Sequence, residues 1–313
     1  MAIDRLTREN LHGVWAAIST PFDERDRFDE ESFRENVRRL AASRVDGIYT
    51  TDSDGEFYAI EFEEFQRIVD AFADETRRLG VPSQVGVTWS HTQGMLDRLR
   101  HAAARGILGA HVGHPYFMDM TPESYRQFWL DVAAAVPADF ALIHYNTPRV
   151  HNYQYGPDYA ILAGLVPNLV GTKHTGSSLP EFLTLMQDAP QLAHFTGEHV
   201  FTPYMMFGAR GVYSSFTSFN APYMVAWYRE CFNGDWEAAR HRQRRVHAFA
   251  ELKRAVFGKG NYHAILHKAV AAASDFLVGN HLTRRPYLPV SDAAVAEFRR
   301  RVDEEFPDLV WRP

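Results

Sequence analysis

The segment LVGTKHTG, residues 169–176, places a lysine at the end of a short apolar run and follows it with histidine, threonine and glycine. Lysine is among the residues least often buried in folded proteins. The ammonium group of Lys173 therefore either reaches solvent, or its amine is held inside the protein for chemistry. The rest of the chain decides between these alternatives.

Seven other short apolar runs resemble this segment, and amphipathic stretches such as 29–44, 61–80 and 121–136 lie between them. With residues 169–176, the runs occupy residues 13–22, 46–53, 82–89, 107–115, 139–148, 192–199 and 210–218. Eight strands that alternate with helices predict an α/β protein with a closed (β/α)8 barrel, a TIM barrel. The stretch between the last two runs, VFTPYMMFGA, is short, which leaves a doubly wound open sheet as the alternative.

The strand pattern stops near residue 221. The remaining residues form long helix-like stretches with loop signals at NGDW and GKGN. We therefore expect a (β/α)8 barrel over residues 1–221 and a C-terminal helical extension over residues 222–313, packed on the barrel.

Composition excludes several classes of protein. Hydrophobic residues make up 46% of the 313, the formal net charge is −6, and the arginines of RHRQRR (240–245) have the spacing of a solvated helix face, so no nucleic-acid partner is expected. Cys231 is the single cysteine, which excludes an intrachain disulfide and a CxxC site. The start of the chain has no apolar signal core and no apolar run approaches the ~18 residues needed to span a bilayer. These features predict a cytoplasmic protein with no membrane partner.

Active sites of such barrels lie at the carboxyl ends of the strands. Polar residues recur there in almost every run: Ser19, Thr20, Ser53, Asp54, Glu56, His91, His111, His114, Tyr145, Asn146, Lys173, His174, Thr175, Glu198, His199, Ser214, Ser215 and Asn220. Strand ends turn polar wherever they reach water, but that explanation accounts less well for so many bulky ionisable groups.

A lysine at a strand end can add its neutral amine to a carbonyl carbon and form a Schiff base. Burial in an apolar barrel is expected to lower the pKa of Lys173 and to free the amine for this reaction. Tyr145 ends the preceding strand, where its phenol could relay the protons that imine formation requires. The alternatives are a lysine paired with a buried carboxylate or extended to solvent, and a tyrosine packed at the rim.

The ordered motifs of the chain resemble the dihydrodipicolinate synthase / N-acetylneuraminate lyase family of class I aldolases over essentially its whole length. The motifs that carry the resemblance are GVWAAISTPF, DGIYTTDSDGEF, YNTP, GTKHTG, TGEH and GARGVYSSFTSFNAP. The resemblance implies Lys173 as the Schiff-base lysine, Tyr145 as the proton relay, and a homotetramer or dimer. It implies a 2-oxo acid and an aldehyde as the small-molecule partners, and imine chemistry that requires no cofactor and no metal.

The loop after the second strand departs from the family pattern. Aligned on Gly55-Glu56, the family's Gly-Thr-Thr/Ser becomes Asp52-Ser53-Asp54. In the family this loop holds the substrate carboxylate, and Ser53 can still donate a hydrogen bond to it or to a departing oxygen. An ionised Asp54 would repel that carboxylate by several kcal/mol (order of magnitude) in a poorly solvated site. Asp54 is therefore expected to be protonated, turned away, or facing a hydroxyl or ammonium group, unless carboxylate binding has moved.

Other positions bear on the substrate. The arginine that dihydrodipicolinate synthases carry five residues after the tyrosine is Val150 here, with Arg149 one residue early, and their Tyr-Tyr pair is Tyr116-Phe117. Dihydrodipicolinate synthesis is therefore not expected, and a larger 2-oxo acid, aromatic or polyhydroxylated, is favoured. Histidines expected near the rim would suit such a partner: His91, His114, His144, His151 and His174. Thr175 and the groups around Tyr213 and Ser214 complete the expected substrate-binding set, with Asp54 or a rim histidine as acid or base.

Three other functions remain open. A 2-oxo sugar-acid dehydratase would use the same lysine, and a non-catalytic barrel would bind a ligand without turnover. A metal-dependent barrel hydrolase is suggested by HVGH (111–114), but the spacing sends His111 and His114 to opposite faces of a strand, so no metal site is expected there.

Overall fold

The computed structural model describes residues 3–176, 178–258 and 263–312. Eight parallel strands form one closed barrel in chain order, so the predicted TIM barrel is confirmed and the open sheet is wrong. Every predicted run contains one strand: β1 (Gly13–Ala17), β2 (Gly47–Thr50), β3 (Ser83–Gly86), β4 (Gly109–Val112), β5 (Ala141–Asn146), β6 (Leu169–His174), β7 (Ala193–Thr196) and β8 (Gly211–Ser214).

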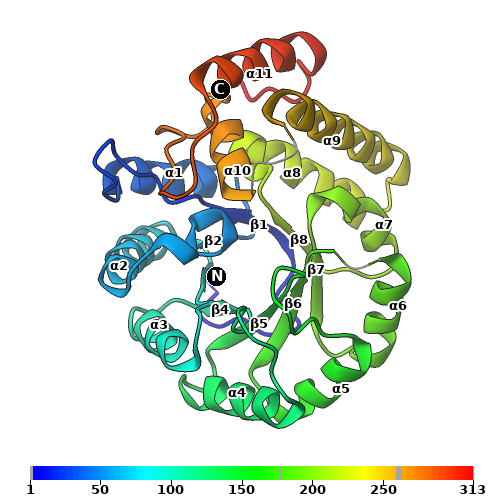
Figure 1. The fold of residues 1–313 in the computed structure, drawn as a ribbon. Helices are drawn as coiled ribbons and strands as arrows, with labels where there is room; N and C mark the ends of the chain where they lie inside the picture. Colours follow the sequence, from blue (N-terminus) through cyan, green and yellow to red (C-terminus); the bar gives the residue numbers. More distant parts are fainter. Residues whose placement is uncertain (1–2, 177, 259–262, 313) are drawn as a thin grey trace.

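Helices surround the barrel, as Figure 1 shows in a view along its axis. They are α1 (Glu30–Ala42), α2 (Phe62–Leu79), α3 (Thr92–Ala104), α4 (Pro122–Ala134), α5 (Gly156–Leu165), α6 (Leu179–Asp188), α7 (Phe201–Met206) and α8 (Thr217–Phe232). Several of them begin with a side-chain cap; Asp29, for example, accepts from the amide of Ser32 at the start of α1. No helix among the described residues has the length and apolar character needed to cross a bilayer.

The C-terminal part adds α9 (Trp236–Phe257), α10 (His263–Ala272) and α11 (Asp292–Glu305), which gather on one side of the barrel (Figure 1). The boundary expected at residue 221 falls inside α8, at a kink where Asn220 leaves helical geometry before Pro222. The division into two units therefore stays a prediction. Short 3₁₀ turns complete the rim: η1 (Ser53–Gly55), η2 (Phe57–Ala59) and η3 (Glu198–Val200).

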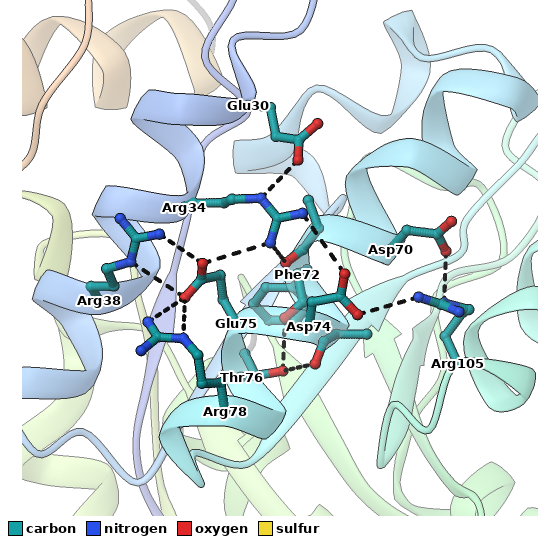
Figure 2. Close-up of polar contacts among 12 residues, drawn as sticks. Glu30, Arg34, Arg38, Asp70, Phe72, Asp74, Glu75, Thr76, Arg78 and Arg105 are labelled. Atoms are coloured by element: carbon teal, nitrogen blue, oxygen red, sulfur yellow. Dashed lines mark hydrogen bonds and ion pairs between the residues drawn. The ribbon is translucent and has the colours of Figure 1, made fainter.

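Two apolar clusters hold the barrel together. One fills its interior with large side chains that include Trp15, Tyr49, Phe195 and Tyr213. The other lies between the sheet and the helices, as expected when strands are buried on both faces. Polar contacts also tie helices α1 and α2 together. Glu75 of α2 accepts hydrogen bonds from Arg38 of α1 and from Arg78, and it forms an ion pair with Arg34 of α1 (Figure 2).

An irregular register between β5 and β6 positions the residues of interest. Leu142 pairs with Leu169 but the next residue, Ile143, pairs with Gly171, so the pairing shifts by one residue there. Without the shift, Asn146 would stand beside Lys173; with it, Tyr145 does. Since side chains alternate between the faces of a strand, this bulge sets Tyr145 and Lys173 side by side on the inner face.

Candidate active site

The carboxyl ends of the strands open into a cavity of about 730 Å³. Its walls come from strand ends, from the η1 and η3 turns, and from helices α9 and α10 of the C-terminal part. Lys173, Tyr49 and Tyr213 line it, together with Asp54, Glu198 and His267. The barrel thus supplies a buried amine at a solvent-accessible hollow, where the family resemblance places the reaction.

Lys173 is 4% exposed and its Nζ donates a 2.7 Å hydrogen bond to Oδ2 of Asp52, which is 1% exposed. Burial alone would lower the pKa of Lys173, but the charge of Asp52 outweighs it and the pKa is raised. The expectation of a lowered lysine pKa was therefore wrong, because the partner carboxylate was not foreseen. Burial pushes the pKa of Asp52 upward, but the charge of Lys173 and a hydrogen bond from His111 hold it at about 2. The resting site contains an ion pair.

A chain of polar contacts continues from this ion pair into the barrel. His111 contacts Asp52 Oδ2 through Nδ1 at 2.9 Å, and its Nε2 lies 2.8 Å from the amide oxygen of Gln84. The hydroxyl of Tyr213 donates to the same oxygen at 2.8 Å. Oδ2 of Asp52 is therefore shared by Lys173 and His111, whereas Oδ1 has no hydrogen-bond partner among the described residues, and a small movement of the carboxylate would change the environment of the amine.

Tyr145 lies next to the amine on the other side. Its ring centroid is 4.2 Å from Lys173 Nζ, and its hydroxyl shares a 3.1 Å hydrogen bond with the hydroxyl of Ser53. The structure thus brings together three of the predicted residues, Lys173, Tyr145 and Ser53.

Asp54 lines the same cavity as Lys173, but its hydrogen bond goes to α10. Its Oδ1 accepts a short hydrogen bond from Nδ1 of His267 and lies 3.8 Å from Nε2 of His263. Burial raises the pKa of Asp54, but the neighbouring histidine charges outweigh it and hold the pKa well below its usual range. Of the expected alternatives, a protonated Asp54 is wrong; the carboxylate is ionised and faces imidazoles of the C-terminal part.

Thr175, Tyr213 and Ser214 occupy different environments. Thr175 and Tyr213 line the large cavity, and the hydroxyl of Thr175 has no hydrogen-bond partner among the described residues. Ser214 is fully buried and is not among the described residues that line this cavity or the one beside it.

A second cavity of about 390 Å³ adjoins Tyr145 and Ser53. Its walls are mainly aromatic and aliphatic: Phe57, Tyr58, Tyr116, Val150 and Tyr287. Arg149 and His263 line both cavities. Val150, which stands where the related synthases carry an arginine, therefore forms part of an apolar wall.

Three of the histidines expected near the rim lie elsewhere. His114, His144 and His174 are buried outside the barrel, against α4 and α5; His114 contacts Trp129, and the rings of His144 and His174 contact Tyr159. Their placement follows from strand alternation, which turns each of them away from the interior, whereas His111 points inward.

Four residues of the site were not singled out from the sequence: Asp52 as the lysine partner, Gln84, and the pair His263 and His267. The spacing HAILH (263–267) puts two histidines on one face of a helix and was a usable signal. Its position in the C-terminal part, far from any strand end, hid its relation to the site.

The backbone before Asp52 has an unusual conformation. Thr51 has φ of 52°, a left-handed conformation that β-branched residues rarely adopt. Its carbonyl also packs so closely on β3 that a Cβ at Gly86 would lie 2.4 Å from it. The turn that aims Asp52 at the lysine is therefore held in place by its surroundings.

Comparisons with known proteins agree with this architecture. The chain is 26% identical over 291 residues to 4-hydroxy-tetrahydrodipicolinate synthase of Methanosarcina mazei, covering 92% of this chain and 96% of the relative. It is also 26% identical over 252 residues to an uncharacterized DapA-like lyase of Halobacterium salinarum, covering 80% and 82%.

Solved structures share the fold at lower identity. YagE, a prophage protein from E. coli K12 solved in complex with pyruvate, superposes with a TM-score of 0.85 at 19% identity, covering 94% of this chain and 98% of that one. CdNal from Clostridium difficile, solved in complex with mannosamine, gives 0.83 at 17% identity, covering 93% and 99%. The model of the dihydrodipicolinate synthetase family matches residues 10–305. This chain belongs to that family and is, with it, a lyase of the Schiff-base-forming class I.

Proposed function

We propose that this lyase forms or cleaves the bond between C3 and C4 of a 4-hydroxy-2-oxo acid, one carbon removed from the 2-oxo group, with an apolar, aromatic-sized aldehyde as the second partner. The observation that carries the proposal is the position of Lys173 Nζ in the wall of the large cavity, 2.7 Å from a carboxylate and beside Tyr145, which lines the apolar cavity. The pyruvate complex of YagE supports the choice of a 2-oxo acid.

Asp52 prepares the amine in this proposal. The ammonium of Lys173 must lose a proton before it attacks the 2-oxo carbon, and Asp52 Oδ2 is within hydrogen-bond distance to take it. After loss of water, the imine withdraws electrons from the adjacent carbon. In the cleavage direction, the bond to the carbinol carbon breaks, its electron pair enters the enamine, and the carbinol becomes an aldehyde.

Tyr145 and Ser53 move the protons. The carbinol hydroxyl gives up its proton as the aldehyde forms, and the water formed with the imine needs a proton as it leaves. The phenol of Tyr145, bonded to Ser53, adjoins the apolar cavity in which the aldehyde part would lie. The hydroxyl of Thr175, which has no partner among the described residues, is available to the substrate carboxylate.

Val150 in the wall of the apolar cavity supports an aldehyde that carries no carboxylate beside this residue, while the neighbouring Arg149 lines both cavities. Dihydrodipicolinate synthesis is therefore not proposed, although curated relatives carry that name. A homotetramer or dimer stays a prediction.

Borohydride trapping tests the proposal. The protein is incubated with pyruvate, with a 4-aryl-4-hydroxy-2-oxobutanoate, or with a 3-deoxy-2-oxo sugar acid, then reduced and mapped by peptide mass spectrometry. We expect an adduct on Lys173, absent from Lys173→Arg and present in Lys253→Arg, whose lysine lines the same cavity. Absence of an adduct with every acid would contradict the proposal.

The polar lining of the large cavity favours one second candidate, dehydration of a polyhydroxylated 2-oxo acid at the same lysine. Product analysis separates the two: the aldolase releases pyruvate and an aldehyde, whereas the dehydratase releases a single product lighter by one water.

A further inference from the structure

We propose that Asp54, His263 and His267 form a binding site for one divalent transition-metal ion in the wall of the Lys173 cavity. One ligand atom from each residue lies within 4.8 Å of the other two. Oδ1 of Asp54 is hydrogen-bonded to Nδ1 of His267 and lies 3.8 Å from Nε2 of His263. A metal ion could therefore replace the proton of this hydrogen bond with small side-chain movements.

The local sequence suits this arrangement. His263 and His267 are four residues apart at the start of α10, so both project from the same face of the helix, and their ring centroids are 4.3 Å apart. Two histidines at this spacing are a known metal-binding arrangement on helices. The carboxylate comes from η1, at the end of strand β2, and the C-terminal part therefore closes the site across the barrel rim.

The surroundings of His267 add an independent observation. Its Nε2 contacts the hydroxyl of Ser215 at 3.1 Å, and that hydroxyl donates to Glu198 at 2.7 Å. Metal-binding histidines usually have their second ring nitrogen held by a carboxylate, a carbonyl or a polar group of this kind, which fixes the ring and the tautomer. Ser215 and Glu198 supply that support and leave Nδ1 directed at Asp54.

Burial and access also fit a site that binds a metal and a further ligand. Asp54 and His267 are buried, while His263 is half-buried and lies where the two cavities meet. Three protein ligands leave coordination positions toward the cavity. Two imidazoles and one carboxylate favour Zn²⁺, Fe²⁺, Co²⁺ or Mn²⁺ over the all-oxygen preference of Mg²⁺ and Ca²⁺.

Carboxylates and cations both surround the proposed site. The positive charge of Lys173 is neutralised by Asp52, which leaves Asp54 and Glu198 as the carboxylates facing the two histidines. Arg149 and Lys253 line the same cavity and oppose the cation. A bound ion would present its free positions to oxygen atoms of the substrate; that role rests on the proposed function, whereas metal binding itself does not.

The competing interpretation is that Asp54 and His267 only attach α10 to the barrel. Metal titration distinguishes the two. Tag-free protein, stripped with a chelator, is titrated with Zn²⁺ by calorimetry and with Co²⁺ by visible absorption. We expect one ion per chain, bound at least ~10-fold more weakly by His263→Gln and about 10-fold more weakly by Ser215→Ala.

His247→Gln is the matched control. This histidine lines the same cavity from α9 and pairs with Glu251, outside the proposed ligand set. Its substitution should leave the affinity unchanged. His263→Gln is the deciding variant because His263 is half-buried and its loss leaves the Asp54–His267 contact in place; Asp54→Asn serves as the second variant.

Binding in the unaltered protein that is no tighter than in His263→Gln and Asp54→Asn would overturn the proposal, as would equal weakening by His247→Gln. The outcome of the borohydride experiment is independent of the outcome of the metal titration. One bound Zn²⁺ without an adduct on Lys173 would retain the metal site and reject the imine mechanism, and the reverse result would do the opposite.

Discussion

Strands β5 and β6 carry buried polar residues on both faces, and the two faces use them differently. Tyr145 and Lys173 point inward and line cavities, whereas the adjacent His144 and His174 point outward between the sheet and the helices. On each strand, a residue that lines a cavity and a histidine that packs against Tyr159 are direct neighbours in the sequence.

The inner face of the barrel carries ionisable residues that contact one another. Lys173, Asp52 and His111 form a connected network in which the resting lysine is an ammonium. Of these three residues only Lys173 lines the cavity, so the amine has a polar partner in the protein and access to a further one, whereas Asp52 and His111 are buried behind it.

The outer face is built from neutral rings. His194 donates from Nε2 to the carbonyl of Ala189 and contacts Thr172 through Nδ1, and His114 accepts from the indole of Trp129 while its Nδ1 contacts the carbonyl of Asn152. Each ring uses one nitrogen as donor and one as acceptor, which only a neutral histidine can do. The comparison teaches that the side of the strand, more than the residue type, determines whether a buried polar group acts on a ligand or supports the fold.

The largest expected effect is on the inner face. Lys173→Arg keeps the positive charge beside Asp52 but removes the amine that forms the imine, so lyase activity should fall at least ~10³-fold. The free energy of unfolding, measured by urea titration, should change much less. Near-normal activity in this variant would remove Lys173 from the reaction.

A pair of tyrosine variants sharpens the comparison. Tyr145→Phe removes the hydroxyl bonded to Ser53 and should lower kcat by about 10²-fold, a typical contribution of a positioned acid or base. Tyr159→Phe removes the hydroxyl that bonds His144 on the outer face and should lower stability while kcat stays near normal. Similar kcat values for the two variants would contradict the division between faces.

Acid is expected to destabilise the protein through the buried histidines of the outer face. Burial lowers the pKa of His114 and of His194 from an ordinary value of 6.5 to about 4. As pH falls below 6.5 the unfolded chain takes up these protons first, so stability present at neutral pH is lost progressively until about pH 4. At pH 5 the loss is about 2 kcal/mol for each ring.

Urea unfolding of the unaltered protein and of His194→Gln at pH 7 and pH 5 measures this loss. The variant should lose about 2 kcal/mol less than the unaltered protein between the two pH values. His247→Gln, which removes an exposed histidine, should show the full drop. An equal drop in His194→Gln would mean that His194 is not the source.

The smallest effect is expected at Glu75, in the contact between helices α1 and α2. Burial raises the pKa of Glu75, but hydrogen bonds from Arg38 and Arg78 outweigh it and lower the pKa (Figure 2). Because these arginines are partly exposed, Glu75→Gln should cost only about 1 kcal/mol of unfolding free energy, measured at low salt, and the cost should shrink in 1 M NaCl. A loss that salt does not change would indicate packing instead of charge as its source.

The barrel and the positions of Lys173 and Tyr145 at strand ends could be predicted from the sequence because both depend on local signals: the spacing of apolar runs and the last residues of two of them. The adjacency of Tyr145 and Lys173 was correct, although the bulge that produces it leaves no clear local signal. The predicted direction of the pKa shift of Lys173 was wrong because the shift depends on which carboxylate of the Asp52-Ser53-Asp54 segment faces the lysine. A 3₁₀ turn decides this, directing Asp52 to Lys173 and Asp54 to α10.

The histidines of α10 could not be assigned to the site for a different reason. Asp54 and His267 are 213 residues apart, and their contact depends on how the C-terminal helices pack on the barrel. Periodicity identifies the face of a helix but not the neighbour against which that face packs.

The left-handed backbone at Thr51 has a consequence for laboratory evolution of this enzyme. Glycine would adopt φ of 52° at lower conformational cost than threonine, but it would remove the side chain of Thr51, which is fully buried. Thr51 also donates from its hydroxyl to the carbonyl of Gly86, which fastens the turn to β3. Relief of the backbone conformation and loss of this buried hydrogen bond therefore oppose each other, so a glycine substitution would gain little heat resistance and would hold Asp52 less firmly against the lysine.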